Sequence, residues 1–251
     1  MVTPLGQAAW AQMSAAAEAL DLAALEALSP LLILAPHADD ETLGCGGLLA
    51  AASDLGLRRR VAYLTDGSAS HAGAPDWPPT RLAAQRRREA LNALAILGVP
   101  ADDVLFLNWP DAKPYAPGDV AYDLSLQTLT AWTQSFRPRS VWAPMEGEAH
   151  CDHQAALGLA HALADRLSQP CVVMEFIVWG WSDIEIAARH GAARIWALDC
   201  ASHVGRRRRA LAQHATQMGQ VISGAKASFV IPSELAALTD RPTELFLERR
   251  R

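Results

Sequence analysis

The chain has 251 residues, of which 51% are hydrophobic and 20% charged, and its mean hydropathy is +0.06. This composition can fill a sizeable core and excludes a disordered, tail-like protein. With 22 Lys and Arg against 27 Asp and Glu, the formal net charge is −5. A net acidic chain argues against nucleic acid or an anionic membrane as the main partner.

The cysteine pattern and the N-terminal segment indicate in which cellular compartment the protein is expected. Four cysteines without a C-x-x-C pair do not make a disulfide framework in a chain of this length. Residues 1–20 lack the basic start and apolar block of a signal peptide, and no window approaches about 18 uninterrupted apolar residues. We therefore expect a cytoplasmic protein without a membrane span. Because no flexible linker divides the chain, we expect one domain over residues 1–251, with 1–29 as an N-terminal helical extension.

In chain order, the predicted elements alternate between short apolar strands and helices. A helical pattern over residues 6–27 comes first and ends before Ser29-Pro30. Strands are predicted at 31–35, 61–65, 104–107, 140–143, 171–178, 194–199 and 244–248. Helices are predicted at 42–52, 81–97, 122–135, 153–167 and 205–218. Continuous apolar strands are typical of a sheet buried on both faces, so we expect an α/β fold of three layers around a mostly parallel sheet.

Three arginine-rich stretches, at 58–60, 86–88 and 206–209, lie in or beside helical patterns. We interpret each as a solvated helix face.

Polar segments follow four of the predicted strands. They are PHADDETLGCGG at 36–47, DGS at 66–68, NWPD at 108–111 and PMEGEAHCDH at 144–153. In a parallel sheet the ligand crevice lies beyond the carboxyl ends of the strands. We therefore expect these imidazoles and carboxylates to share one rim of the sheet.

The first of these segments concentrates acidic residues behind a histidine. Asp39, Asp40 and Glu41 are consecutive, which is unfavourable after a buried strand unless a cation lies among them. A helix N-terminus stabilises such carboxylates by about 0.3–1 kcal/mol each, which accounts for one or two of them but not for the histidine. Because His37 and Asp40 are three residues apart, one turn can aim both at a single point.

The last segment carries two histidines with the same spacing. His150 and His153 lie at the start of a predicted helix, where both can face one centre, and imidazole is the commonest metal ligand. Two histidines and one carboxylate leave a coordination position for water, as in catalytic zinc sites. Asp39 is then a candidate general base. The histidine that does not bind the metal could stabilise the oxyanion or act on the leaving group.

These segments resemble the motifs of a known family. APHADDETLGCGG at 35–47 is similar to the AHPDDE-type opening motif of the LmbE-like deacetylases, also called the PIG-L family, and HCDH at 150–153 is similar to its HxxH motif. HATQ at 214–217 resembles an H-x-S-Q segment of that family, and the similarity extends over about residues 30–220. Ala38 stands where the family usually has proline, and Thr216 where it usually has serine.

The resemblance implies a Rossmann-like, three-layer α/β/α fold and a zinc-dependent hydrolase. Such an enzyme removes N-acyl, mostly N-acetyl, groups from small molecules that contain an amino sugar, with zinc-bound water as the nucleophile. His37, Asp40 and His153 match the metal ligands, and Asp39 matches the general base. His150 matches the histidine that stabilises the oxyanion, where an imidazolium is most effective.

Further expectations concern the walls of the site. Arg86 and Asp111 match positions that contact the sugar in some family members. Asp152, adjacent in sequence, is expected to orient His150. We expect specificity loops at 66–80, 112–121 and 177–192, and the tryptophans Trp179 and Trp181 as wall residues.

Three alternatives compete with this interpretation. The same donors would also accept Fe2+. A non-catalytic small-molecule or metal-binding protein could share the fold, although it would more often lack part of the constellation. A dinucleotide site is disfavoured because the run from Gly44 to Gly47 ends without the last glycine of G-x-G-x-x-G and follows three acidic residues.

Overall fold

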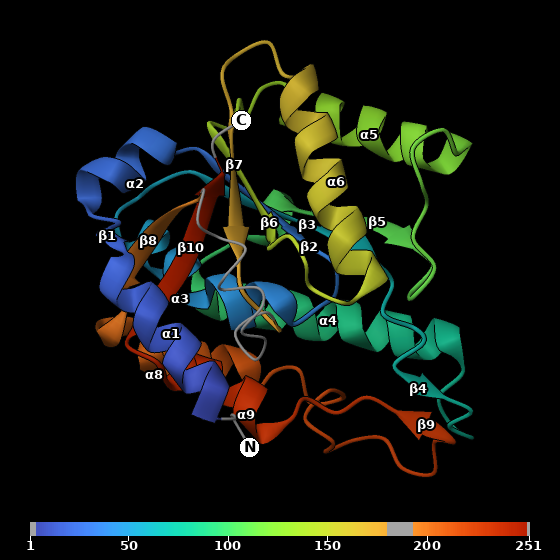
Figure 1. Cartoon of the computed structure of the whole chain (residues 1–251). Coiled ribbons are helices and arrows are strands. Elements are labelled where there is room, and N and C mark those ends of the chain that lie inside the picture. Colours follow the sequence, from blue (N-terminus) through green and yellow to red (C-terminus); the bar gives the residue numbers. More distant parts are fainter. Residues whose placement is uncertain (1–3, 180–192, 250–251) are drawn as a thin grey trace.

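The computed structural model describes residues 4–179 and 193–249 (Figure 1). Its helices are α1 (Pro4–Ala16), α2 (Leu22–Leu28), α3 (Asp40–Asp54), α4 (Pro79–Leu97), α5 (Val120–Thr133), α6 (Cys151–Arg166), α8 (Val204–Leu211) and α9 (Ser233–Ala236). Its strands are β1 (Glu18–Ala19), β2 (Leu31–Ala35), β3 (Arg59–Thr65), β4 (His71–Ala72), β5 (Val104–Trp109), β6 (Ser140–Pro144), β7 (Val172–Phe176), β8 (Ala193–Asp199), β9 (Ala227–Ser228) and β10 (Thr243–Arg249).

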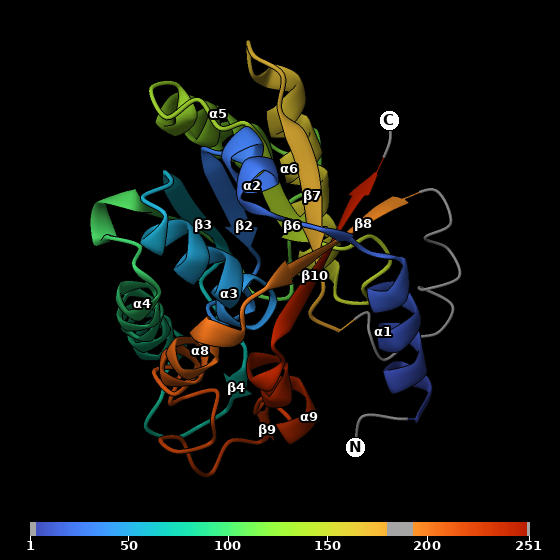
Figure 2. The same cartoon turned by 90° about the vertical axis from the view of Figure 1, so that its left-hand side faces the viewer.

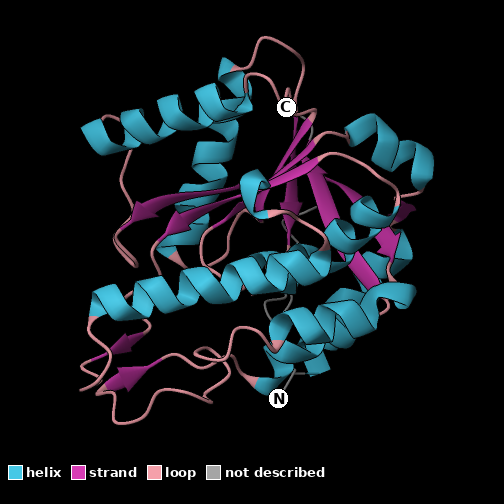
Figure 3. Cartoon of the chain, turned by 180° about the vertical axis from the view of Figure 1, so that it is seen from behind, coloured by secondary structure: helices cyan, strands magenta, loops and turns pink. Residues whose placement is uncertain are grey.

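The central sheet has the order β1-β8-β10-β7-β6-β2-β3-β5. All neighbours from β7 to β5 are parallel, whereas β10 runs antiparallel to both β7 and β8. The two short strands β4 and β9 form a separate antiparallel pair near the start of the long helix α4 (Figure 3). The expected mixed α/β fold with a mainly parallel sheet is confirmed.

Helices cover both faces of this sheet (Figure 2). On β2, Leu31 and Ile33 belong to the core that includes α3 and α4, whereas Leu32 and Leu34 belong to the core that includes α5 and α6. All four side chains are fully buried, which is why the strand is apolar at every position rather than at alternate ones.

The N-terminal extension contains a strand that the helical pattern over residues 6–27 does not predict. The pattern breaks between α1 and α2, where Glu18 and Ala19 pair in parallel with β8 at the edge of the sheet. Pairing with a distant strand overrides the local helix propensity of this Ala-rich segment. Within the described residues, no helix is both long and apolar enough to cross a membrane.

The interpretation of the arginine stretches as solvated helix faces was wrong for residues 58–60 and for Arg86 and Arg207, whereas Arg87, Arg88, Arg208 and Arg209 are exposed on α4 and α8. Arg59 and Arg60 lie in strand β3, while Arg86 and Arg207 are only 3% and 1% exposed. The guanidinium of Arg207 lies 3.1 Å from Glu244, whose carboxylate accepts the backbone N–H groups of two residues of α3. A buried arginine requires such tertiary partners, which a local pattern does not reveal.

Two helical glycines offer a matched test of the packing around α3. A Cβ at Gly44 would overlap the fully buried ring of Phe176, whereas a Cβ at Gly158 in α6 meets nothing within 4 Å. We expect Gly44→Ala to lower the free energy of unfolding by about 1–3 kcal/mol. Gly158→Ala should raise it by about 0.5–1 kcal/mol, since alanine favours a helix interior. Urea unfolding of both variants measures the difference, and equal effects would contradict this packing.

Candidate metal and catalytic site

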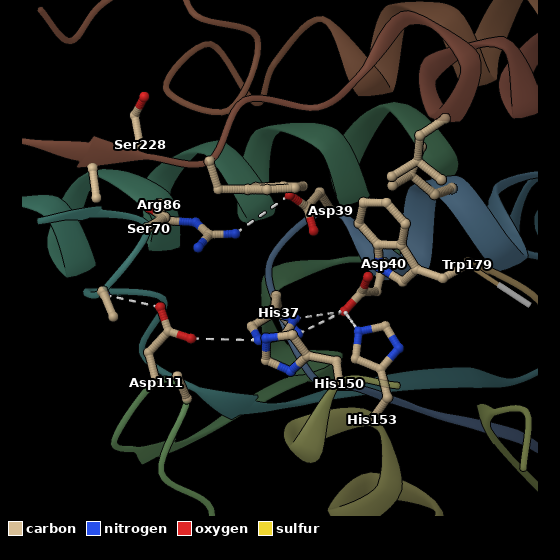
Figure 4. Close-up of a pocket in the computed structure, with 16 residues that line it drawn as sticks. His37, Asp39, Asp40, Ser70, Arg86, Asp111, His150, His153, Trp179 and Ser228 are labelled. Carbon is tan, nitrogen blue, oxygen red and sulfur yellow. Dashed lines mark hydrogen bonds and ion pairs between the residues drawn. The ribbon is translucent and has the colours of Figure 1, made fainter. Parts of the chain in front are cut away.

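The polar segments that follow the strands meet at one edge of the sheet. Strands β6, β2, β3 and β5 are consecutive and parallel, so their carboxyl ends share a rim. There the side chains surround a cavity of about 330 Å³ (Figure 4). All of the predicted site residues except Asp152 line it: His37, Asp39, Asp40, Arg86, Asp111, His150 and His153.

Three of these side chains converge on one point. Oδ2 of Asp40 lies 3.1 Å from Nδ1 of His37 and 3.4 Å from Nε2 of His153. One potential ligand atom from each residue lies within 4.8 Å of the others. Figure 4 shows both imidazoles turned toward the Asp40 carboxylate. Two nitrogens and one oxygen form the donor set of a catalytic zinc site with an open position.

Each imidazole contacts a second carboxylate through its other nitrogen. Nε2 of His37 lies 3.0 Å from Asp152 Oδ2, and Nδ1 of His153 lies 2.5 Å from Glu148 Oε2. Both carboxylates are almost fully buried. A carboxylate that accepts the proton of one ring nitrogen leaves the other nitrogen free as a metal ligand. The residues present therefore fit a divalent cation.

The charge balance of the site also favours a cation. Although burial acts to lower it, the carboxylates of Asp40 and Glu148 raise the pKa of His153 to about 9. The surroundings of this imidazole thus favour an added positive charge, which a proton or a metal ion can supply.

Glu148 contacts the site, although the motif analysis did not assign it there. Besides His153, its carboxylate accepts the backbone N–H groups of Val178 and Trp179, at 2.7 and 2.8 Å. It therefore joins the loop after β6 to the segment after β7. In the sequence, Glu148 is marked only by lying five positions before His153. Closeness in sequence does not by itself show that the two side chains contact each other.

Asp39 has an unusual backbone conformation between β2 and α3. Its φ of +147° lies in a region that residues other than glycine rarely adopt, at a cost of about 1–3 kcal/mol. Its backbone N–H donates to Glu41 at 3.0 Å, and its carboxylate lies 3.4 Å from the Arg86 guanidinium. Burial raises the pKa of the Asp39 carboxyl to about 7, although Arg86 acts to lower it. A carboxyl poised near neutral pH suits the predicted role of general base.

His150 is the N-cap of α6. Its Nδ1 accepts the backbone N–H of Asp152 at 3.2 Å, which assigns the ring proton of the neutral form to Nε2. Burial lowers the pKa of His150, and the nearby His37 and His153 lower it further. These contacts favour a neutral ring that donates through Nε2 over the imidazolium expected from the resemblance.

Arg86 lines the cavity, but its hydrogen bonds are to the protein. Its guanidinium donates to the backbone oxygens of Gly67 and Ala38, at 3.1 and 3.0 Å, and reaches Asp39. The structure thus ties Arg86 to the loop that carries Asp39, while contact with a sugar stays a prediction.

Asp111 and Asp152 share a neighbour. Asp111 Oδ1 lies 3.4 Å from Nε2 of His37, the atom that Asp152 approaches at 3.0 Å. Burial acts to raise the pKa of Asp111, but the hydrogen bond with His37 contributes to lowering it to about 2. Asp152 Oδ2 is 3.8 Å from Nδ1 of His150, so the carboxylate expected to orient His150 instead contacts His37.

The remaining wall comes from segments far apart in the chain. The expected loops 66–80, 112–121 and 177–192 contribute Ala69 and Ser70, Ala112, and Trp179. Residues 180–192 of the last loop, Trp181 among them, lie outside the described residues. Residues 227–235, which the sequence analysis did not assign to the site, supply Ala227, Ser228, Phe229 and Leu235.

Comparison with known families accords with this geometry. Residues 32–164 match the family described as PIG-L: GlcNAc-PI de-N-acetylase. The match covers more than half of the chain, and the chain belongs to the PIG-L family. The matched part contains the whole rim from β2 to the start of α6, and the resemblance inferred from the motifs is confirmed.

Solved structures share the fold. The N,N'-diacetylchitobiose deacetylase of Pyrococcus horikoshii is 21% identical, with a TM-score of 0.58 over 82% of this chain and 72% of that chain. The A40926 pseudoaglycone deacetylase Dbv21 is 20% identical, with a TM-score of 0.63 over 89% and 98%. GalB, the 4-carboxy-2-hydroxymuconate hydratase of Pseudomonas putida KT2440, is 18% identical, with a TM-score of 0.62 over 84% and 82%. Since a hydratase shares the architecture, the reaction must be argued from the site.

Glu148 offers a test of the metal site. Glutamine cannot both accept the two backbone N–H groups and accept the Nδ1 proton of His153, so Glu148→Gln disturbs the orientation of that ligand. We expect the affinity for Zn2+ to fall by about 10- to 100-fold. Glu146→Gln is the control, because Glu146 is 63% exposed and pairs with Arg249. Calorimetric titration of the metal-free proteins with Zn2+ measures both, and equal affinities of Glu148→Gln and the wild type would contradict this role.

Proposed function

We propose that this chain is a zinc-dependent amidohydrolase that removes an N-acyl group, with N-acetyl as the first candidate, from a small molecule containing an amino sugar. The observation that carries the proposal is the convergence of His37, Asp40 and His153 beside Asp39, in a cavity open to a ligand. Membership of the PIG-L family supports the same reaction class.

The proposed chemistry assigns a separate task to each group. When bound, zinc supplies Lewis acidity that polarises an amide carbonyl and lowers the pKa of water at the site to about 7. Asp39 takes the proton from the attacking water, and the Arg86 guanidinium holds its carboxylate in place. The Nε2–H of His150 donates to the oxygen on which negative charge develops. Asp39 then returns this proton to the amine nitrogen as the C–N bond breaks, so the products are a free amine and a carboxylate.

Zinc is proposed over iron because two imidazoles and one carboxylate are a common ligand set for catalytic zinc. Fe2+ accepts the same donors, so metal analysis of the purified protein decides between the two.

The cavity walls suggest how such a substrate is oriented. The polar lining, suited to sugar hydroxyls, comprises Ser70, Arg86, Asp111 and Ser228. The apolar lining, suited to the acyl or another apolar group, comprises Leu43, Trp179, Phe229 and Leu235. Figure 4 shows Trp179 beside Asp40 and His153, away from Ser70, Asp111 and Ser228.

Replacing Asp39 tests the catalytic proposal. Asp39→Asn keeps the shape of the side chain but removes the proton acceptor, so kcat should fall by about 10²- to 10⁴-fold, with the zinc content unchanged. Amine release from a panel of N-acetylglucosamine derivatives measures turnover, and elemental analysis measures the metal. Asp102→Asn, at an exposed position, is the control.

The outcomes separate the hypotheses. Removing the metal with a chelator should abolish turnover, and added Zn2+ should restore it. Bound zinc without turnover on any acylated amine would favour a non-catalytic binding protein. Failure to bind any divalent metal would overturn the proposed mechanism.

Trp179 tests the orientation of the substrate. Its ring packs against Phe229, with the centroids 5.8 Å apart, and both residues line the cavity. Trp179→Ala should raise KM about tenfold or more for substrates that reach the apolar wall, because an aromatic surface is lost. Trp77→Ala, outside the cavity lining, should leave KM unchanged. An unaltered KM in Trp179→Ala would place the substrate against the polar wall alone.

A further inference from the structure

The segment His214-Ala215-Thr216-Gln217 follows α8 and contacts both the start of α3 and the cavity wall. The side chains of His214, Thr216 and Gln217 are fully buried, and the cavity lining does not include them. Neither the metal site nor the proposed chemistry uses this segment. Its contacts reach the loop of Asp39 from two directions.

The first set of contacts acts on the backbone of Asp39. Nε2 of His214 lies 3.3 Å from Oε1 of Glu41, and Thr42 donates its hydroxyl to the same oxygen at 2.6 Å. The other oxygen of Glu41 accepts the backbone N–H of Asp39 at 3.0 Å. The Glu41 carboxylate thus joins His214 to the residue whose φ is +147°.

The second set of contacts leads toward the carboxylate of Asp39. Thr216 donates its hydroxyl to Glu89 at 2.6 Å, and its backbone N–H lies 3.2 Å from the same carboxylate. Glu89 and Arg86 are three residues apart on α4, so they lie on the same side of that helix. Arg86 in turn contacts the Asp39 carboxylate.

The same segment also contacts the cavity wall. Gln217 donates from its side-chain amide to the hydroxyl of Ser70 at 3.2 Å, and its backbone carbonyl oxygen accepts the backbone N–H of Ile231 at 2.8 Å. Ser70 lines the cavity, and Ile231 lies in the 227–235 segment that forms another part of its wall.

We propose that residues 214–217 are a positioning segment, which holds Asp39 in its strained conformation through Glu41 on one side and, on the other, by fixing through Glu89 the part of α4 that carries Arg86. A positive φ at a non-glycine residue persists only where the surroundings over-determine it, and these contacts supply that constraint. The catalytic part of this inference rests on the proposed function, whereas the structural part does not.

Paired substitutions test each set of contacts. Thr216→Val removes the hydroxyl with little change of shape, and Thr216→Ser restores it. His214→Leu removes the donor to Glu41, and His214→Gln offers an amide donor in its place. Thr133→Val is the matched control, because that buried hydroxyl bonds within α5, away from the site.

Two readouts separate positioning from general stability. In Thr216→Val and His214→Leu, kcat should fall by about 10- to 100-fold with KM and zinc content little changed, and the Ser and Gln variants should recover most of it. Hydrogen exchange of the peptide covering residues 36–43, followed by mass spectrometry, should become faster in the same two variants and not in Thr133→Val.

The exchange readout needs no turnover, so it tests the segment even if the proposed function fails. Unchanged exchange in residues 36–43 in both Thr216→Val and His214→Leu would overturn the proposal. So would a fall in kcat that the Ser and Gln variants share, or one that Thr133→Val reproduces. If one of the two apolar variants fails to fold, the pair at the other position decides in the same way.

Discussion

The site depends on how one buried carboxylate oxygen is satisfied. Oδ2 of Asp40 accepts the backbone N–H of His37 at 2.9 Å and lies within 3.4 Å of ring nitrogens of both His37 and His153. Although burial acts to raise it, the charges and hydrogen bonds of these two histidines hold the pKa of Asp40 well below its ordinary range. A buried anion requires such partners, and they connect the loop after β2 to the start of α6.

Carboxylates and imidazoles alternate on both sides of that oxygen. Each histidine lies between Asp40 and a further buried carboxylate, Asp152 for His37 and Glu148 for His153. Glu148 also fixes the backbone after β7, so the ligand geometry is tied to the central sheet rather than to one loop. Such an arrangement sets the donor atoms before any ion binds, which lowers the cost of assembling the site.

The fold places the site residues at one edge of the sheet, but it does not determine which reaction they catalyse. Deacetylases and a hydratase share this architecture with the chain. What distinguishes one member from another must lie in the groups that face the ligand, such as Asp39 and His150, and in the walls around them. In this chain one wall comes from residues 227–235, which reach the cavity through the pairing of β9 with β4.

The sequence by itself determined the alternation of strands and helices, the parallel core of the sheet, and the family, because periodicity and short motifs are local signals. That His37, Asp40 and His153 belong to one site was predictable from the short polar segments that follow the strands and from the family motifs, while their role as metal ligands and the catalytic roles of Asp39 and His150 stay predictions. Tertiary structure decided the antiparallel β10, the edge strand β1, the burial of Arg86 and Arg207, and the partners Glu148 and His214. His214 meets Thr42 across 172 residues of chain. Contacts over such separations depend on how elements pack, and they have no local pattern by which to be recognised.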